Sequence, residues 1–286
     1  MRVGTAGWHY EDWKGLVYGR GDRSHPLSHI SQWFDAVEVN VTFYRHVNPA
    51  NAANWAHLVE GNQRFRFVVK AWQGFTHGAG REIESSELKR FKEGVQPLAE
   101  AGMLGCVLAQ FPWSFRRTKA NRAYLAGIVD ALGPWPVVVE FRHASWDTPE
   151  TLAGMRERGV AFCNIDQPLF QDSLAPTGYV TSRIAYVRLH GRNHEHWFRE
   201  ESERDDRYNY LYTGEELKPW LARIEQLRKL VDAVFVITNN HYRGQAVVNA
   251  LELQDRLGIG PNVGRLPETL VAAYPQLAEV VARRHG

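Results

Sequence analysis

The chain has 286 residues, of which 44% are hydrophobic, 23% charged and 12% aromatic, which is typical of a globular protein and not of a disordered or disulfide-rich one. The net charge of +2 is too small to indicate nucleic-acid binding by itself. No stretch approaches the roughly 20 apolar residues of a membrane span, and the first residues lack the apolar core of a signal peptide. Cys106 and Cys163 lie in apolar runs that are typical of buried thiols. We therefore expect a cytoplasmic protein without a membrane partner.

Eight short apolar runs recur along the chain, and each has the length of a buried strand. The predicted strands are 2–6, 36–40, 64–70, 105–111, 137–142, 160–166, 184–190 and 233–240. Most segments between them look helical, and three carry helix start signals. These signals are Asn48-Pro49, Thr148-Pro149 with Gly159 as the stop, and Thr213 with Glu216 in capping-box spacing. The connection 167–183 lacks helical periodicity, and a C-terminal helix is predicted over about 267–284.

The alternation of strands and helices fits either a closed parallel barrel or a doubly wound sheet. A doubly wound sheet would gather its polar chemistry at one switch point, behind a glycine-rich phosphate turn. Here all eight runs end in polar side chains, and the chain contains neither G-x-G-x-x-G nor G-x-x-x-x-G-K-[ST]. The sequence therefore predicts an α/β fold, a single (β/α)8 TIM-barrel domain over 1–286 with its site at the carboxyl ends of the strands.

The two faces of each predicted strand differ in polarity. Side chains alternate across a strand, and in most of the runs one face is apolar while the other is mixed. Because the apolar face must meet the helices, the mixed face is predicted to point into the barrel. Charges there must pair with one another or with a ligand, since an unpaired buried charge is costly. The charged side chains predicted to converge are Glu38, Lys70, Glu140, Arg142, Asp166, Arg188 and His190.

A series of short motifs follows in order from Gly4 to about Leu253. They are GTAGWHYEDWKGLVY, VEVNVTFYR, FRFVVKAWQGFTH, VLAQFPWSF, VEFRHASW, YVRLHGRN, RYNYLY and FVITNNHYRGQAVVNALEL. Together they resemble the YecE-like family, domain of unknown function 72. The resemblance implies a TIM barrel related in shape to the xylose isomerase and apurinic endonuclease group, and it implies no established reaction. The charged segment Arg199–Arg207 departs from the usual pattern, within a lid-like insertion after the seventh strand, expected over about 191–212.

Glu140 and His190 are the first candidates for acid/base chemistry. Apolar walls raise the pKa of a carboxyl group and a neighbouring arginine lowers it, so both influences compete at Glu140. The alternative is a structural ion pair between Glu140 and Arg142 or Arg188. The full set of candidate catalytic residues is Glu140, His190, Lys70, Glu38 and Asp166.

Lys70 follows an apolar run and would be a Schiff-base nucleophile if it were desolvated. We expect instead that Glu38 and Glu140 hold it protonated, so that it pairs with them or with an anionic substrate. On this expectation, borohydride would trap no adduct at Lys70.

A positive surplus is predicted at the barrel mouth, to which Arg45 and His77 in adjacent loops contribute. Guanidinium groups favour phosphate or carboxylate, which they hold through two parallel hydrogen bonds. We therefore expect an enzyme for a small anionic substrate, with a hydrolase, lyase or isomerase reaction favoured. The predicted substrate-binding residues are Arg142, Arg188, Asn40, Tyr44, Arg45, His77, Gln110, Trp146, Asn239 and Asn240.

Two other classes of function stay open. Metal-dependent phosphodiester chemistry or nucleic-acid binding would follow the apurinic endonuclease analogy, although a shared fold is weak support for a shared function. No cofactor is predicted; a divalent metal, if bound, would use Glu140, Asp166 and His190, but the neighbouring cations would compete with it. A ligand-binding protein without catalysis is the third possibility. The sequence does not indicate an oligomeric state.

Overall fold

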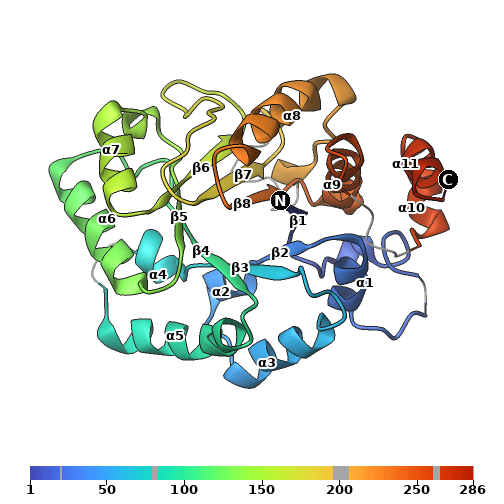
Figure 1. Ribbon diagram of the computed structural model, residues 1–286, viewed down its shortest axis with the longest axis horizontal. Coiled ribbons are helices and arrows are strands. Elements are labelled where there is room, and N and C mark those ends of the chain that lie inside the picture. The colour runs from blue at the N-terminus through green and yellow to red at the C-terminus, as the bar shows by residue number, and fades with distance from the viewer. Residues whose placement is uncertain (20, 79–82, 196–205, 260–264, 286) are drawn as a thin grey trace.

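The core of the molecule is a closed barrel of eight parallel strands in the order β1 to β8. The computed structural model describes residues 1–19, 21–78, 83–195, 206–259 and 265–285. Figure 1 shows the ring of strands with helices arranged around it, and the predicted (β/α)8 TIM barrel is confirmed. The strands are β1 (Arg2–Ala6), β2 (Ala36–Val39), β3 (Arg66–Lys70), β4 (Leu104–Gln110), β5 (Val137–Glu140), β6 (Ala161–Asp166), β7 (Ile184–Leu189) and β8 (Ala233–Thr238).

The helices begin where the capping side chains predict. Asn48 caps α3 and Thr148 caps α7 through side-chain oxygens. Thr213 and Glu216 form the predicted capping box of α8. The helices are α1 (Pro26–Trp33), α2 (Val41–Tyr44), α3 (Pro49–Leu58), α4 (Gln73–Thr76), α5 (Ser85–Glu100), α6 (Lys119–Leu132), α7 (Pro149–Glu157), α8 (Gly214–Arg228), α9 (Gln245–Arg256), α10 (Glu268–Ala273) and α11 (Leu277–His285), with single 3-10 turns at η1 (Glu11–Trp13), η2 (Ala144–Trp146), η3 (Asp206–Tyr208) and η4 (Tyr242–Gly244).

The C-terminal segment differs from the prediction. The single helix expected over about 267–284 is two helices, α10 and α11. The break falls at Tyr274, which precedes Pro275, and a proline ring disfavours the helical conformation of the residue before it. Of the predicted lid, residues 196–205 lie outside the described residues, including most of the charged segment Arg199–Arg207.

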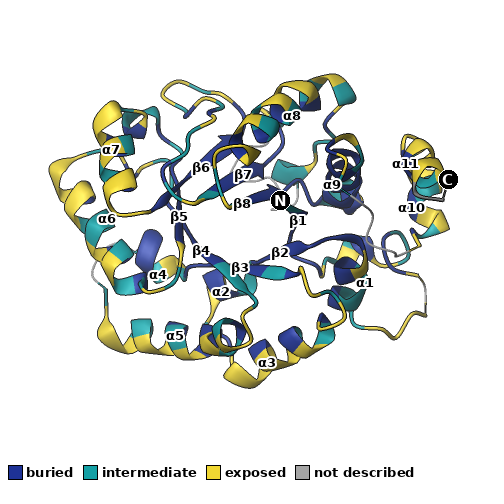
Figure 2. Ribbon diagram, viewed as in Figure 1, coloured by how far each residue is buried: buried dark blue, intermediate teal, exposed yellow. Residues whose placement is uncertain are grey.

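Figure 2 shows that the strands are buried, while the outer faces of α3, α5, α6 and α7 are exposed. The apolar faces of the strands are therefore covered by the helices. Inside the barrel, the rings of Tyr186 and Phe235 lie 6.2 Å apart. The pairing of β3 with β4 shifts register, which leaves Gly105 as an extra residue. A Cβ at Gly105 would lie 2.7 Å from the Phe235 ring, so the absent side chain makes room for this aromatic layer.

Strand β6 presents the opposite face to the barrel interior from the one that was predicted. Cys163 points into the barrel, with its sulfur 3.8 Å from Oε2 of Glu140. Asp166 therefore points outward, where it accepts two hydrogen bonds from Arg192 at 2.9 and 2.7 Å and one from the indole of Trp220 on α8. The prediction that Asp166 joins the converging charges was wrong, because its partners come from the loop after β7 and from α8.

Candidate functional site

Four charged side chains alternate in sign across the carboxyl end of the barrel. Arg188 on β7 donates from Nε and Nη2 to the two oxygens of Glu38 on β2, at 3.0 and 2.5 Å. Its Nη1 donates to Oε2 of Glu140 on β5 at 3.0 Å. Arg142 pairs with Oε1 of Glu140 at 2.7 Å, and Tyr186 donates its hydroxyl to Glu38 at 2.9 Å. The two carboxylates are thus matched by two guanidinium groups.

The arginines keep the buried carboxylate of Glu140 charged. Burial alone would raise the pKa of Glu140, but Arg142 and Arg188 hold it well below its usual value. Burial also opposes the charge of Arg188, yet Glu38 and Glu140 hold its pKa well above the usual value. Glu140 is therefore a fixed anion near neutral pH. The geometry favours the ion-pair alternative for Glu140 over its use as a general acid.

His190 is part of the same network. Its Nδ1 lies 2.9 Å from the amide nitrogen of Asn239, and its Nε2 lies 3.2 Å from Oε1 of Glu140. If Asn239 donates to Nδ1, the ring proton is on Nε2 and faces Glu140. Burial, followed by the charge of Arg142, lowers the pKa of His190 well below its usual value. A neutral ring that is fully buried between Asn239 and Glu140 is poorly suited to proton exchange with a substrate.

Lys70 differs from the other charged side chains of the barrel in its contacts. It ends β3, its residue is 8% exposed, and its Nζ lies 4.0 Å from the centroid of the Phe43 ring. Among the residues that the structure describes, no carboxylate forms an ion pair with it. Burial, followed by the charge of Arg188, lowers the pKa of Lys70 to about 7. Glu38 and Glu140 raise this pKa, as expected, but burial and the charge of Arg188 lower it more, so the two glutamates do not hold Lys70 fully protonated at neutral pH.

Local structure fixes the surroundings of Lys70. Helix α2 starts directly after β2, and the hydroxyl of Thr42 donates to the backbone carbonyl of Lys70 at 2.6 Å. This bond ties α2 to the end of β3 and holds the Phe43 ring beside Nζ of Lys70. The ring displaces water from the amine, although its face also attracts the ammonium form.

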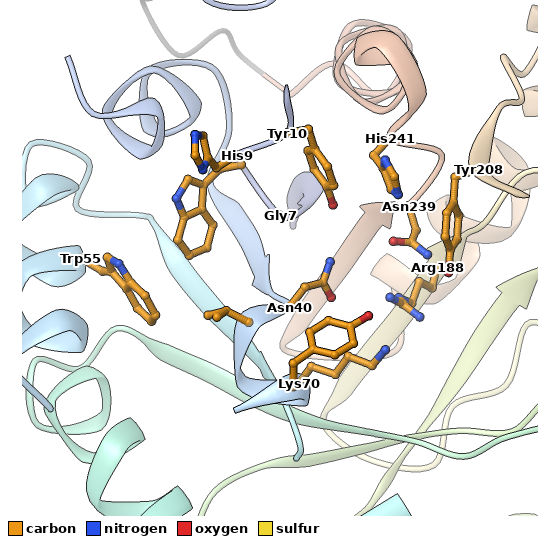
Figure 3. Close-up of a pocket in the computed structure, with 13 residues that line it drawn as sticks. Gly7, His9, Tyr10, Asn40, Trp55, Lys70, Arg188, Tyr208, Asn239 and His241 are labelled. Carbon is orange, nitrogen blue, oxygen red and sulfur yellow. The ribbon is translucent and has the colours of Figure 1, made fainter. Parts of the chain in front are cut away.

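A cavity of about 480 Å³ opens above these residues. Figure 3 shows Lys70 and Arg188 at its lower end, Asn40 and Asn239 beside them, and Trp55 on the side opposite Tyr208. The ring of His241 stacks on Tyr10 with centroids 4.2 Å apart. The residues that line the cavity are Gly7, Trp8, His9, Tyr10, Asn40, Val41, Tyr44, Trp55, Lys70, Arg188, Tyr208, Asn239 and His241.

Three further predicted residues lie near this site without lining the cavity. The amide of Gln110 is buried and donates to the carbonyl of Phe111 at 2.9 Å. Arg45 follows α2 and is exposed. His77 keeps an exposed edge, yet partial burial, followed by the charge of Lys70, lowers its pKa to about 4. His77 therefore does not add the positive charge that was predicted.

Trp146 and Asn240, like Asp166, lie away from the cavity. The indole of Trp146 donates to the carbonyl of Phe115 at 2.6 Å, within a stack of rings outside the barrel. Asn240 donates to the side-chain oxygen of Asn249 on α9 at 2.8 Å. Their predicted placement at the mouth was wrong, because both residues face the helices.

Several residues of the site were not among the predicted binding residues. His241 directly follows the last strand end, and this position could have identified it. Trp55 lies within α3 and contacts Trp8, with ring centroids 5.3 Å apart, and nothing in its sequence context indicates this. Gln167 accepts a hydrogen bond from Arg142 at 2.9 Å, which follows from the alternation in β6 that was assigned to the wrong face.

Among the described ranges, no group of three or more His, Cys, Asp and Glu side chains is arranged to hold a metal ion. The conditional metal set of Glu140, Asp166 and His190 is not assembled, because Asp166 points out of the barrel. In the described part of the chain, no helix has the length and apolar composition that crossing a membrane requires. Both cysteines are buried thiols, as predicted.

The chain was compared with known proteins. It is 31% identical to the UPF0759 protein YunF of Bacillus subtilis (strain 168), over 90% of this chain and 94% of that protein. The crystal structure of a DUF72 family protein from Thermotoga maritima MSB8 matches with a TM-score of 0.80 and 34% identity, covering 90% of this chain and 98% of that one. One from Enterococcus faecalis V583 matches with a TM-score of 0.79 and 27% identity, covering 90% and 95%. The family model described as "Protein of unknown function DUF72" matches residues 2–271, and the chain belongs to this family.

Proposed function

We propose that this protein is an enzyme that binds a small, polar, anionic molecule in the cavity at the carboxyl ends of the strands. Lys70 is the group that meets the anion and exchanges a proton with it. The observation that carries this proposal is a buried ammonium that has no acidic partner among the described residues and lies at the end of a cavity of about 480 Å³.

The charge balance of the barrel supports an anion as the ligand. Glu38 and Glu140 are neutralised by Arg142 and Arg188, so protonated Lys70 is one positive charge in excess. A buried charge without a partner is unfavourable, and a bound anion would supply that partner. The anion is therefore proposed to bind at Lys70. Arg188, whose donors are directed at the two glutamates, is a poorer partner than we expected from the sequence.

The other residues of the cavity favour a small molecule. The volume lies within the range of about 300–1,000 Å³ that is usual for small-molecule sites. Asn40 and Asn239 add neutral amide groups near Lys70, and the aromatic side chains give the ligand apolar surfaces. A pKa of about 7 allows Lys70 to accept or donate a proton at neutral pH, which is the condition for efficient acid/base catalysis.

Sulfate is a suitable probe, because its charge is constant between pH 6 and 9. Calorimetry at pH 6 should show sulfate binding to the parent protein and a loss of at least tenfold in affinity for Lys70→Met. Lys229→Met, which removes an exposed lysine after α8, removes the same net charge and should bind like the parent. Affinity for the parent should fall about tenfold per pH unit above pH 7, as Lys70 loses its proton.

Equal sulfate affinity of the parent and Lys70→Met would refute the anion site. A sulfate affinity that stays constant from pH 6 to 9 would also contradict the proposal, since the bound state then does not depend on the charge of Lys70.

A further inference from the structure

We infer that Lys70 is an amine nucleophile and that the substrate is a small carbonyl compound with an anionic group, which Lys70 binds covalently as an imine. This inference rests on the proposed function, since it uses the same cavity. It reverses the expectation from the sequence that Lys70 forms no adduct.

A lysine becomes nucleophilic when its neutral amine is stabilised relative to the ammonium. Burial away from water and a neighbouring cation both have this effect, and acidic partners oppose it. Lys70 has the first two conditions, because the residue is only 8% exposed and Arg188 lines the same cavity. The opposing carboxylates are each held by arginines. The charged or titratable groups that act on Lys70 are Arg188, Glu38, Glu140 and Arg142 in the barrel and His77 nearby.

The exposed lysines of the chain are a useful contrast. Lys14 and Lys218 each pair with a glutamate on their own turn, and both are more than half exposed. Water and the carboxylates keep such amines protonated, so they react slowly with carbonyl compounds at neutral pH. Lys70 is buried at the cavity and forms no ion pair with a carboxylate of the described residues, and its low pKa adds to this contrast.

The cavity also offers binding partners for the anionic group of the substrate. When an imine is protonated, the positive charge stays on the nitrogen of Lys70 and can pair with a carboxylate on the adjacent carbon. Asn40 and Asn239 line the same cavity, and their side-chain amides are the neutral donors proposed to bind this carboxylate. A 2-oxo acid has both groups on neighbouring atoms and is smaller than the cavity.

The covalent step is balanced without a further reactant. The lone pair of neutral Lys70 Nζ forms a bond to the carbonyl carbon, and the electron pair of the carbonyl π bond moves to oxygen, which takes a proton. The nitrogen then loses a proton, its lone pair forms the second carbon–nitrogen bond, and the hydroxyl leaves with a proton as water. The product is the protonated imine, or iminium, and loss of its N–H proton gives the neutral imine, so the net change is amine plus carbonyl to imine plus water. The iminium form draws electrons from the neighbouring bond of the substrate.

The test uses pyruvate and glyoxylate as probes, with propionaldehyde as a carbonyl compound that has no anionic group. The full-length protein is incubated with each probe and sodium cyanoborohydride, and the modified residue is located by peptide mass spectrometry. We expect one adduct per chain, at Lys70, at least tenfold faster than at any exposed lysine. Its rate should rise with pH and level off above about pH 7, whereas exposed lysines should continue to gain reactivity toward pH 10. Lys70→Arg should abolish this adduct, and Lys229→Arg should retain it.

The outcomes separate this inference from the proposed function. Sulfate binding that depends on Lys70, without any adduct at Lys70 from the three probes, overturns the imine and leaves the anion site. Adducts spread evenly over exposed lysines also overturn it. An adduct at Lys70 that forms equally fast with propionaldehyde and pyruvate supports the reactive amine and contradicts the anionic substrate. Absence of both sulfate binding and trapping overturns both proposals.

Discussion

The low pKa of Lys70 should be visible in the pH dependence of stability. The unfolded chain binds a proton at Lys70 up to about pH 10.5, and the folded protein only up to about pH 7. Between these values the unfolded state binds more protons, so the free energy of unfolding rises with pH. Burying the charge costs about 5 kcal/mol well below pH 7, because the two pKa values differ by about 3.5 units at about 1.4 kcal/mol each.

Lys70→Met removes this cost while keeping an apolar side chain of similar length against Phe43. From pH 6 to pH 9, the stability of the parent relative to Lys70→Met should rise by about 2–3 kcal/mol. The free energy of unfolding is measured by urea titration with tryptophan fluorescence at each pH. Comparing the two proteins cancels the other groups that titrate in this range.

Lys229→Met is the control, and its stability relative to the parent should not change from pH 6 to 9. If the difference between the parent and Lys70→Met is also independent of pH, Lys70 is protonated throughout and the structural reasoning fails. Direct titration of the Lys70 side-chain carbon by NMR, assigned by its absence from Lys70→Met, checks the same pKa.

Three further predictions concern the framework of the site. Arg188→Met leaves two buried carboxylates without their shared partner and should lower the free energy of unfolding by roughly 3–5 kcal/mol. Arg183→Met, at a residue whose side chain is 88% exposed, should lower it by less than about 1 kcal/mol. Equal losses in the two variants would contradict the ion-pair network. Asp166→Asn should lower stability by about 2 kcal/mol and leave sulfate affinity unchanged, and a changed affinity would return this residue to the site. A chain that ends before Ala233 lacks β8, which pairs with both β1 and β7, so expression and size-exclusion chromatography should yield no soluble monomer.

Strand positions could be predicted well, because apolar runs and caps are local signals. The inward faces of β2 and β7 also follow from alternation, as the pairing of Glu38 with Arg188 requires. At β6 the side chains alternate but the wrong face was chosen as the inward one, because Asn164 and Asp166 are polar and yet face outward. Asn164 donates to the carbonyl of Tyr179, and Asp166 accepts from α8, so tertiary partners satisfy polar groups on a face that would otherwise be apolar.

The converging charges and an ion pair of Glu140 with Arg142 or Arg188 were predicted, but the pairing of Arg188 with Glu38 was not. Alternation shows which side chains share a face, but which carboxylate each cation reaches depends on barrel geometry. Arg188 contacts both glutamates, and this leaves Lys70 without them. The chemistry inferred for the site depends on this pairing of Arg188 with both glutamates. Trp55 was missed for a related reason, since a side chain from a helix reaches the cavity only through tertiary packing.

The alternating chain of Glu38, Arg188, Glu140 and Arg142 has a consequence for how this protein can change through evolution. Replacing any one of these residues leaves a net charge in the barrel, so single changes pass through destabilised intermediates. Their identities are therefore expected to vary together or not at all among related chains. Invariance of Glu38 and Glu140 in such a set would reflect the integrity of the barrel, whereas invariance of Lys70, which forms no ion pair with a carboxylate of the described residues, would indicate selection for ligand binding.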